Sequence, residues 1–377
     1  MQGKRIYLDF NASTLLAPEV AAAMNQVLAE PFGNPSSEHW AGQPAKQAVE
    51  TARRQVADLL GCEPHEVVFT SGGSESNNHA LKGVFFANGT AGAHIITTQV
   101  EHPAVLNACR FLERLGATVT YVGVDGYGRV DPDEIRRAVT PKTILISVMH
   151  ANNEVGTVQP IADIARIARE RSILFHTDAA QSVGKIATRV RELGVDLLSI
   201  ASHKLYGPKG AGALYIRNGV RLEPLVHGAG HESGRRAGTE NVLLDVGLGT
   251  ACALANGLVG MAPVQQLREL FWNYLKEKFG DGVVLNGHPT ERLPNTLNVS
   301  FVGKVGAEIL ASMDDVAAST GSACHADSVE LSPVLKAMRI PRQVGMGAIR
   351  FSLGRTTTPE EIERVVSLLA TALSGMA

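Results

Sequence analysis

Hydrophobic residues recur along the chain with two different periods. A period of three to four residues, as on one face of a helix, covers residues 18–29 and 43–60. Pro18 begins the first segment and Gly61 follows the second, which is typical of helix starts and ends. Short apolar runs, most of them separated by helix-length stretches, predict strands at residues 66–70, 94–98, 118–122, 143–148, 172–177, 197–201 and 212–216.

This alternation of strands and helices predicts an α/β fold whose sheet is mostly parallel, with helices on both faces. One connection departs from the pattern. Residues 212–216 follow 197–201 too closely for a helical crossover, so we expect these two strands to pair antiparallel. The apolar run 242–263 contains Asp245, Asn256 and several glycines, and it predicts a buried helix rather than a membrane span.

The pattern changes near residue 260, where the strands become shorter. The elements predicted there are a helix at 264–279, strands at 296–301 and 348–352, and a final helix at 359–373. A length of 377 residues also suits two domains of ordinary size. We therefore predict a large domain over residues 1–260 and a smaller C-terminal α/β domain over 261–377. The first residues, up to about 15, are expected to pack on the small domain.

Composition and charge narrow the class of protein. Hydrophobic residues make up 45% of the chain, which excludes a disordered protein, and the net charge of −2 predicts neither nucleic-acid nor membrane binding. The N-terminal sequence is charged before an apolar signal region could form, so we predict a cytoplasmic protein. His227 and His231 lie among glycines and predict no metal site. The cysteines lack a CxxC pair, which excludes a zinc ribbon and a disulfide scaffold; they are Cys62, Cys109, Cys252 and Cys324.

Three polar clusters follow predicted strands, where ligands of open α/β sheets bind. Residues 70–77 (TSGGSESN) precede a helix, which suits either a phosphate site or an ordinary N-cap turn. Asp178 suits a metal ligand, a general base, a partner for a protonated ring nitrogen or a helix cap. Lys204 stands between two strands, where desolvation lowers the pKa of a lysine and favours a nucleophilic amine. Together the three clusters fit a pyridoxal phosphate site.

Ten ordered motifs extend over almost the whole chain. They are YLDFNAST (7–14), FGNPSS (32–37), TSGGSESN (70–77), EHP (101–103), NNEVG (152–156), DAAQ (178–181), SHK (202–204), RAGTEN (236–241), GSAC (321–324) and RFSLG (350–354). In this order they resemble the NifS/IscS-type cysteine desulfurases, which belong to the class V aminotransferase family. The resemblance implies the pyridoxal phosphate-dependent transferase fold type I, with a large cofactor-binding domain and a smaller C-terminal domain.

The resemblance implies roles around pyridoxal phosphate. Lys204 forms the Schiff base and moves the substrate proton. Asp178 holds the ring nitrogen protonated, Gln181 reaches the ring hydroxyl, and His102 stacks on the ring and acts as a catalytic residue. The other cofactor contacts implied are Asn153 near the ring, Gly73, Ser74, Ser202 and His203 around the phosphate, and Thr239, which the partner subunit of a homodimer supplies.

The same resemblance implies the substrate and the reaction. Arg350, beside Asn153, binds the carboxylate of L-cysteine, a bidentate task that suits guanidinium. Cys324 lies in a small, polar stretch that suits an exposed, reactive thiol, whereas the other cysteines lie in helical or core contexts. We predict that Cys324 takes the substrate sulfur as a persulfide, that L-alanine is released, and that the sulfur passes to an acceptor protein such as one in iron–sulfur cluster assembly.

Three other functions stay open at this point. Selenocysteine lyase shares the scaffold, and three features favour it: Ser74 stands where threonine is common, residues 325–335 depart from the usual run after the cysteine, and the C-terminal extension used for scaffold docking is missing. An aminotransferase needs no Cys324. A non-catalytic binding protein is disfavoured by the joint presence of the proposed catalytic residues.

Overall fold

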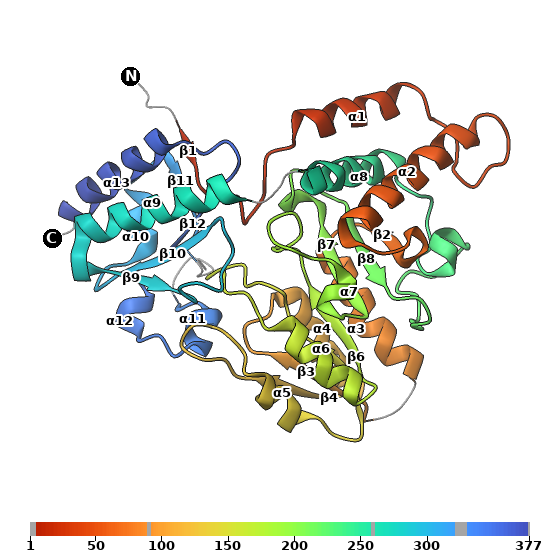
Figure 1. The fold of residues 1–377 in the computed structure, drawn as a ribbon, viewed down its shortest axis with the longest axis horizontal. Coiled ribbons are helices and arrows are strands. Elements are labelled where there is room, and N and C mark those ends of the chain that lie inside the picture. Colours follow the sequence, from red (N-terminus) through yellow and green to blue (C-terminus); the bar gives the residue numbers. More distant parts are fainter. Residues whose placement is uncertain (1–4, 89–91, 258–260, 321–329, 376–377) are drawn as a thin grey trace.

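The computed structural model describes residues 5–88, 92–257, 261–320 and 330–375 (Figure 1). A seven-stranded sheet dominates it, in the order β2-β8-β7-β6-β5-β3-β4. The strand bounds are Val67–Thr70 (β2), His94–Thr98 (β3), Thr118–Val122 (β4), Thr143–Ser147 (β5), Leu174–Asp178 (β6), Leu197–Ala201 (β7) and Gly212–Ile216 (β8). Only β8 runs antiparallel to its neighbours in this described sheet. The predicted mostly parallel sheet and the antiparallel pairing of residues 212–216 are confirmed.

Helices cover both faces of this sheet. Successive side chains of a strand point to opposite faces, so Val67 packs in the core beneath α2, α6 and α8, whereas Val68 packs with α3 and α4. Gly61 ends α2 as predicted, in a left-handed conformation with φ 67°. The helix bounds here are Pro18–Ala29 (α1), Gly42–Leu60 (α2), Gly73–Asn88 (α3), Pro103–Arg114 (α4), Pro132–Ala138 (α5), Ile161–Glu170 (α6), Val190–Leu193 (α7) and Val242–Gly257 (α8).

A second, smaller group of elements lies beside the large sheet (Figure 1). Its three-stranded antiparallel sheet has the order β12-β10-β9, and β1 pairs in parallel with β11. The bounds are Ile6–Tyr7 (β1), Ala262–Phe279 (α9), Val283–Asn286 (β9), Thr296–Phe301 (β10), Gly306–Ala311 (α10), Val316–Ala317 (β11), Pro333–Ala337 (α11), Arg342–Gly345 (α12), Ala348–Ser352 (β12) and Pro359–Ser374 (α13). Ile6 and Leu8 share one buried core with Phe271 and Phe351. The domain bounds at residue 260 stay a prediction.

The apolar run at 242–263 forms α8, which ends at Gly257. Within the described ranges, no helix is both long enough and apolar enough to cross a membrane. Leu248 and Cys252 of α8 are fully buried, which is the packing expected for a helix that is apolar on most sides. The prediction of a buried helix at this position is therefore confirmed.

The small sheet turns one polar face toward the large sheet. Along β10, Leu297 and Val299 enter the apolar core, while Asn298 between them points the other way and donates to the carbonyl of Glu154 at 3.0 Å. Asn298 is paired in register with Arg350 on β12, so both side chains share this face. Side chains alternate between the two faces along β12, and the side chain of Arg350 therefore points into the space between the two sheets.

Candidate active site

A cavity of about 380 Å³ opens at the carboxyl ends of β6 and β7, beside the first turn of α3. This is the edge at which open α/β sheets bind ligands. The lining residues are Asn11, Ala12, Gly73, Ser74, Asn77, His102, Met149, Ala151, Asn153, Asp178, Ala180, Gln181, Ala201, His203, Lys204 and Arg350. Most of the residues predicted from sequence therefore meet in one place.

Three predicted residues are not among those that line the cavity. Ser202 is buried behind it, and its Oγ has no hydrogen-bond partner among the described residues. Thr239 is exposed and lines a separate cavity of about 180 Å³ with Arg236 and Asp245. Cys324 lies outside the described residues, so its predicted role stays a prediction.

Lys204 ends a short 3₁₀ turn, Ser202–Lys204, that follows β7 directly. Its Nζ donates to two backbone carbonyls of the N-terminal segment, Asn11 at 2.6 Å and Ala12 at 2.8 Å. Burial and, to a smaller extent, the positive charge of Arg350 lower the pKa of Lys204, while Asp9 and Asp178 raise it; together these effects give a pKa of about 8. A substantial fraction of this amine is therefore neutral and nucleophilic near neutral pH.

Asp178, the last residue of β6, provides a buried carboxylate in the cavity. Its oxygens accept from Asn77 Nδ2 at 2.6 Å and from the backbone N–H of Ala180 at 3.0 Å. Among the described residues it forms no ion pair, which is rare for a buried carboxylate. A protonated pyridine nitrogen is the type of cationic partner that this arrangement accepts, so Asp178 fits pyridoxal phosphate.

The part of the cavity beside α3 suits a phosphate. Gly73 and Ser74 form the first turn of α3, where backbone N–H groups are free and the helix dipole favours an anion. A Cβ at Gly73 lies 3.3 Å from the Cβ of Ala201, so the glycine keeps this end of the cavity open. His203 lines the cavity, and the unpartnered hydroxyl of Ser202 lies next to it in sequence. These groups also fit the cofactor.

His102 stands between β3 and α4 as the N-cap residue of that helix. Its Nδ1 accepts from the backbone N–H of Ala104 at 3.1 Å, which leaves Nε2 as the site of the proton in the neutral ring. Desolvation by the surrounding protein lowers the pKa of His102, and the charge of Lys204 lowers it further, whereas Asp178 raises it. A neutral imidazole at the mouth of the cavity can stack on a ring and exchange a proton.

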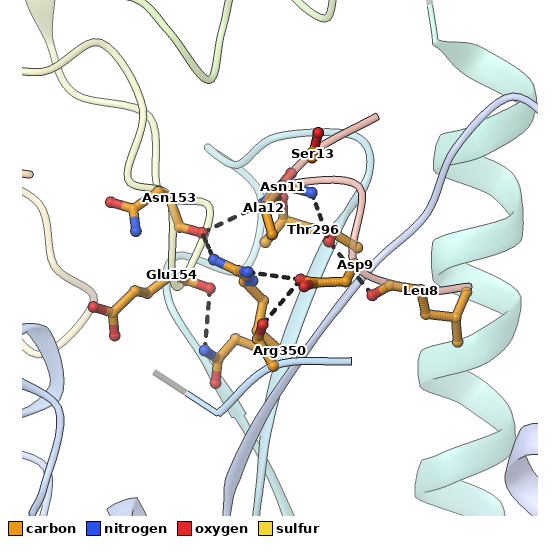
Figure 2. A network of polar contacts seen from close by, with 12 residues as sticks. Leu8, Asp9, Asn11, Ala12, Ser13, Asn153, Glu154, Thr296 and Arg350 are labelled. Carbon is orange, nitrogen blue, oxygen red and sulfur yellow. Dashed lines mark hydrogen bonds and ion pairs between the residues drawn. The ribbon is translucent and has the colours of Figure 1, made fainter. Parts of the chain in front are cut away.

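Arg350 reaches the cavity from β12, and Figure 2 shows it between Asp9 and Asn153. Its guanidinium donates to Oδ1 of Asp9 at 2.7 Å and to the backbone carbonyl of Asn153 at 2.9 Å. The same Asp9 oxygen accepts from Ser319 at 3.0 Å. Arg350 is 8% exposed, and this framework holds its cationic group at one position in the cavity.

Sequence reasoning assigned no role to Asn11, which joins several parts of the site. Its Nδ2 donates to Oγ1 of Thr296 at 2.8 Å and to the carbonyl of Asn153 at 3.3 Å, and these three residues lie together in Figure 2. The carbonyl of Asn11 accepts from Lys204. Gly156 has φ 80°, and a Cβ there lies 2.9 Å from the Cβ of Thr296, so only glycine permits this close approach. The sequence signal that could have identified Asn11 is the motif YLDFNAST, which contains several polar residues in a short segment. The motif NNEVG combines polar residues with Gly156 in the same way.

Comparison with known proteins assigns the class. The aminotransferase class-V family model matches residues 6–365. The cysteine desulfurase IscS of Dictyoglomus turgidum is 49% identical, over 97% of this chain and 94% of that protein. The cysteine desulfurase IscS of Methanosarcina thermophila is 46% identical, over 98% of this chain and 92% of that protein.

Comparison with solved structures identifies the same class of protein as the sequence relatives do. A NifS-like protein has a TM-score of 0.91 and 37% identity, over 98% of this chain and all of that one. SspA in complex with cysteine has a TM-score of 0.83 and 40% identity, over 92% of this chain and 98% of that one. The chain belongs to the aminotransferase class-V family, with the PLP-dependent fold type I. Within that family it is one of the pyridoxal phosphate-dependent cysteine desulfurases of NifS/IscS type, and its relatives favour this assignment over selenocysteine lyase.

We predict that the cofactor-free protein takes up pyridoxal phosphate faster as the pH rises, with a midpoint near 8, the pKa of Lys204. The reason is that only the neutral amine attacks the cofactor aldehyde. Stopped-flow absorbance over about three pH units centred near pH 8 measures this rate. The matched control is Lys204→Ala, which lacks the pH-dependent covalent phase. A wild-type rate that does not change over this pH range contradicts the prediction.

Proposed function

We propose that this protein converts L-cysteine to L-alanine and carries the released sulfur as a persulfide on Cys324. The proposal rests on one observation: a single cavity of suitable size for the cofactor and substrate is lined by Lys204, Asp178, His102 and Arg350. The relatives named cysteine desulfurase and the neighbour solved with cysteine support the same substrate.

Different residues of the chain perform substrate binding and proton transfer. Arg350 and Asn153 bind and orient the substrate carboxylate, with the guanidinium already fixed by Asp9. Pyridoxal phosphate, when bound, supplies an electron sink for the charge that develops at the substrate Cα. Lys204 holds and moves the Cα proton, which its pKa of about 8 permits near neutral pH.

Cys324 is the nucleophile that takes up the substrate sulfur. Its thiolate attacks the substrate sulfur, an S–S bond forms, and the bond between the substrate Cβ and sulfur breaks. The electron pair of the broken bond stays with the carbon skeleton, which takes up a proton and leaves as alanine. Cys62, Cys109 and Cys252 do not suit this role, because burial raises the pKa of each thiol well above its usual range.

The domain division places this reaction between two parts of the chain. In the proposed arrangement the large domain, residues 1–260, supplies Lys204 and the cofactor cradle. The small domain, residues 261–377, supplies Arg350 and Cys324. The N-terminal segment connects the two parts, because Ile6 and Leu8 are buried with the small-domain core while the carbonyl of Asn11 accepts from Lys204.

A homodimer and a sulfur-acceptor protein complete the proposal. Thr239 is exposed in the single chain, which agrees with a residue that serves the cofactor phosphate of a partner subunit. Phe32 is 82% exposed and Trp40 is 79% exposed, and their rings contact each other on the surface near α1 and α2. Exposed aromatic pairs of this kind are typical of contact surfaces between proteins.

Replacement of Cys324 by alanine is expected to retain bound cofactor and to lower alanine and sulfide production from L-cysteine by more than about a hundredfold, because the nucleophile is lost. Visible absorbance reports the cofactor, and amino-acid analysis reports alanine. Cys62→Ala is the matched control, since Cys62 is a partly exposed thiol outside the cavity. Full activity of Cys324→Ala overturns the persulfide mechanism.

Mixed dimers test whether Thr239 acts across the interface. Thr239→Val alone is expected to weaken pyridoxal phosphate binding about tenfold, the effect of one hydrogen bond to a charged phosphate. A mixed dimer of differently tagged Thr239→Val and Lys204→Ala subunits retains one complete site if Thr239 serves the partner. Equilibrium titration of the purified mixed dimer is then expected to show wild-type affinity at half of the sites. No high-affinity site in the mixed dimer, or a monomeric protein, contradicts the proposal.

A further inference from the structure

Lys185 lies four residues after Gln181 in the turns that follow β6, behind the cavity wall, and has no role in the mechanism above. Its Nζ donates to Oε1 of Gln181 at 2.9 Å and to Oδ1 of Asn11 at 3.2 Å. Both acceptor residues line the cavity, whereas Lys185 does not. The lysine therefore contacts two side chains of the site from outside.

The ammonium group fixes the orientation of the Gln181 amide. Nζ of Lys185 is the donor to Oε1 of Gln181. In its protonated form Lys185 donates hydrogen bonds and cannot accept them, so protonated Lys185 requires the amide oxygen of Gln181 to face it. The amide nitrogen then faces the other way, where it donates to the carbonyl of Asn11 at 2.9 Å. A reversed amide places an NH₂ group against the ammonium and loses both hydrogen bonds.

The same lysine fixes a second amide. Oδ1 of Asn11 accepts from Lys185 and also from Asn295 at 3.0 Å, which leaves Nδ2 of Asn11 to donate to Thr296 and Asn153. The carbonyl of Asn11 is in turn the closest acceptor of Lys204, at 2.6 Å. Lys185 thus orders the segment against which the proposed Schiff-base lysine lies.

Lys185 performs this role without a counter-ion among the described residues. It has no carboxylate within ion-pair distance, and its neighbours Lys204 and Arg350 are cations. Desolvation and, to a smaller extent, those two charges lower the pKa of Lys185 to about 7. A lysine retained at such an electrostatic cost is a candidate for function rather than for stability.

We propose that Lys185 is a positioning residue that makes Gln181 present its N–H, and not its carbonyl, to the cofactor ring oxygen. This inference rests on the proposed function and on the position beside the ring hydroxyl that the family resemblance implies for Gln181. The N–H is the group that an anionic ring oxygen requires, whereas a carbonyl at this position repels it.

The test is Lys185→Met, which keeps the length of the side chain and removes all donors. Pyridoxal phosphate is expected to bind about tenfold more weakly, and the visible absorption spectrum of the bound cofactor is expected to shift, because the ring oxygen loses a fixed donor. Lys185→Arg keeps a cationic donor and is expected to retain most of the affinity. Lys142→Met, at an exposed lysine, is the matched control and leaves both readouts unchanged.

A double variant separates positioning from a general structural role. If Lys185 acts through Gln181, Lys185→Met combined with Gln181→Ala binds the cofactor no more weakly than Gln181→Ala alone. Additive losses, or a wild-type spectrum in Lys185→Met, overturn the inference. Neither readout uses L-cysteine, so a wild-type protein that binds the cofactor but releases no alanine contradicts the proposed function and leaves this inference intact.

Discussion

The concentration of positive charge in one cavity governs the chemistry of this protein. Lys204 and Arg350 line the cavity, and Lys185 lies behind its wall. Desolvation lowers the pKa of both lysines, Arg350 lowers both further, and Lys204 also lowers that of Lys185. The same field attracts anions, which suits both a cofactor phosphate and a substrate carboxylate. An electropositive site therefore yields two properties at once, affinity for anionic ligands and a neutral amine at Lys204.

This arrangement depends on a short N-terminal segment between the two sheets. Ile6 and Leu8 anchor it in the apolar core of the smaller sheet, and a few residues later the carbonyls of Asn11 and Ala12 accept from Lys204. Carbonyl oxygens partly offset the desolvation of an ammonium group without adding a full negative charge. Asp9 of the same segment, together with Asp178, raises the pKa of Lys204 against this desolvation, and the pKa is about 8.

Local sequence patterns predicted the parts of the site that follow strands. Asp178 ends one parallel strand and Lys204 closely follows another, and ligands of open α/β sheets bind at the carboxyl ends of strands, so periodicity placed both residues at the same edge of the sheet. The order of the strands, which makes the two residues neighbours, comes from the structure. The contact of Asp9 with Arg350 could not be predicted in this way, because it joins residues 341 positions apart. The two-residue strands β1 and β11 are too short to show a period. The placement of Thr239 depends on a second chain, which no pattern within one sequence describes.

The ion pair of Arg350 with Asp9 bears on how substrate binds. A guanidinium that already donates to a carboxylate at 2.7 Å and to a carbonyl at 2.9 Å attracts another carboxylate less strongly than a free arginine does. Asp9 and the substrate carboxylate therefore share one cation, and the free energy of substrate binding is reduced. The chemical step is accelerated only by interactions that are stronger in the transition state than in the bound substrate. Weaker binding of the substrate carboxylate by Arg350 therefore lowers the turnover rate of bound substrate little. Asp9 thereby fixes the position of Arg350 while limiting how tightly the ground state is held.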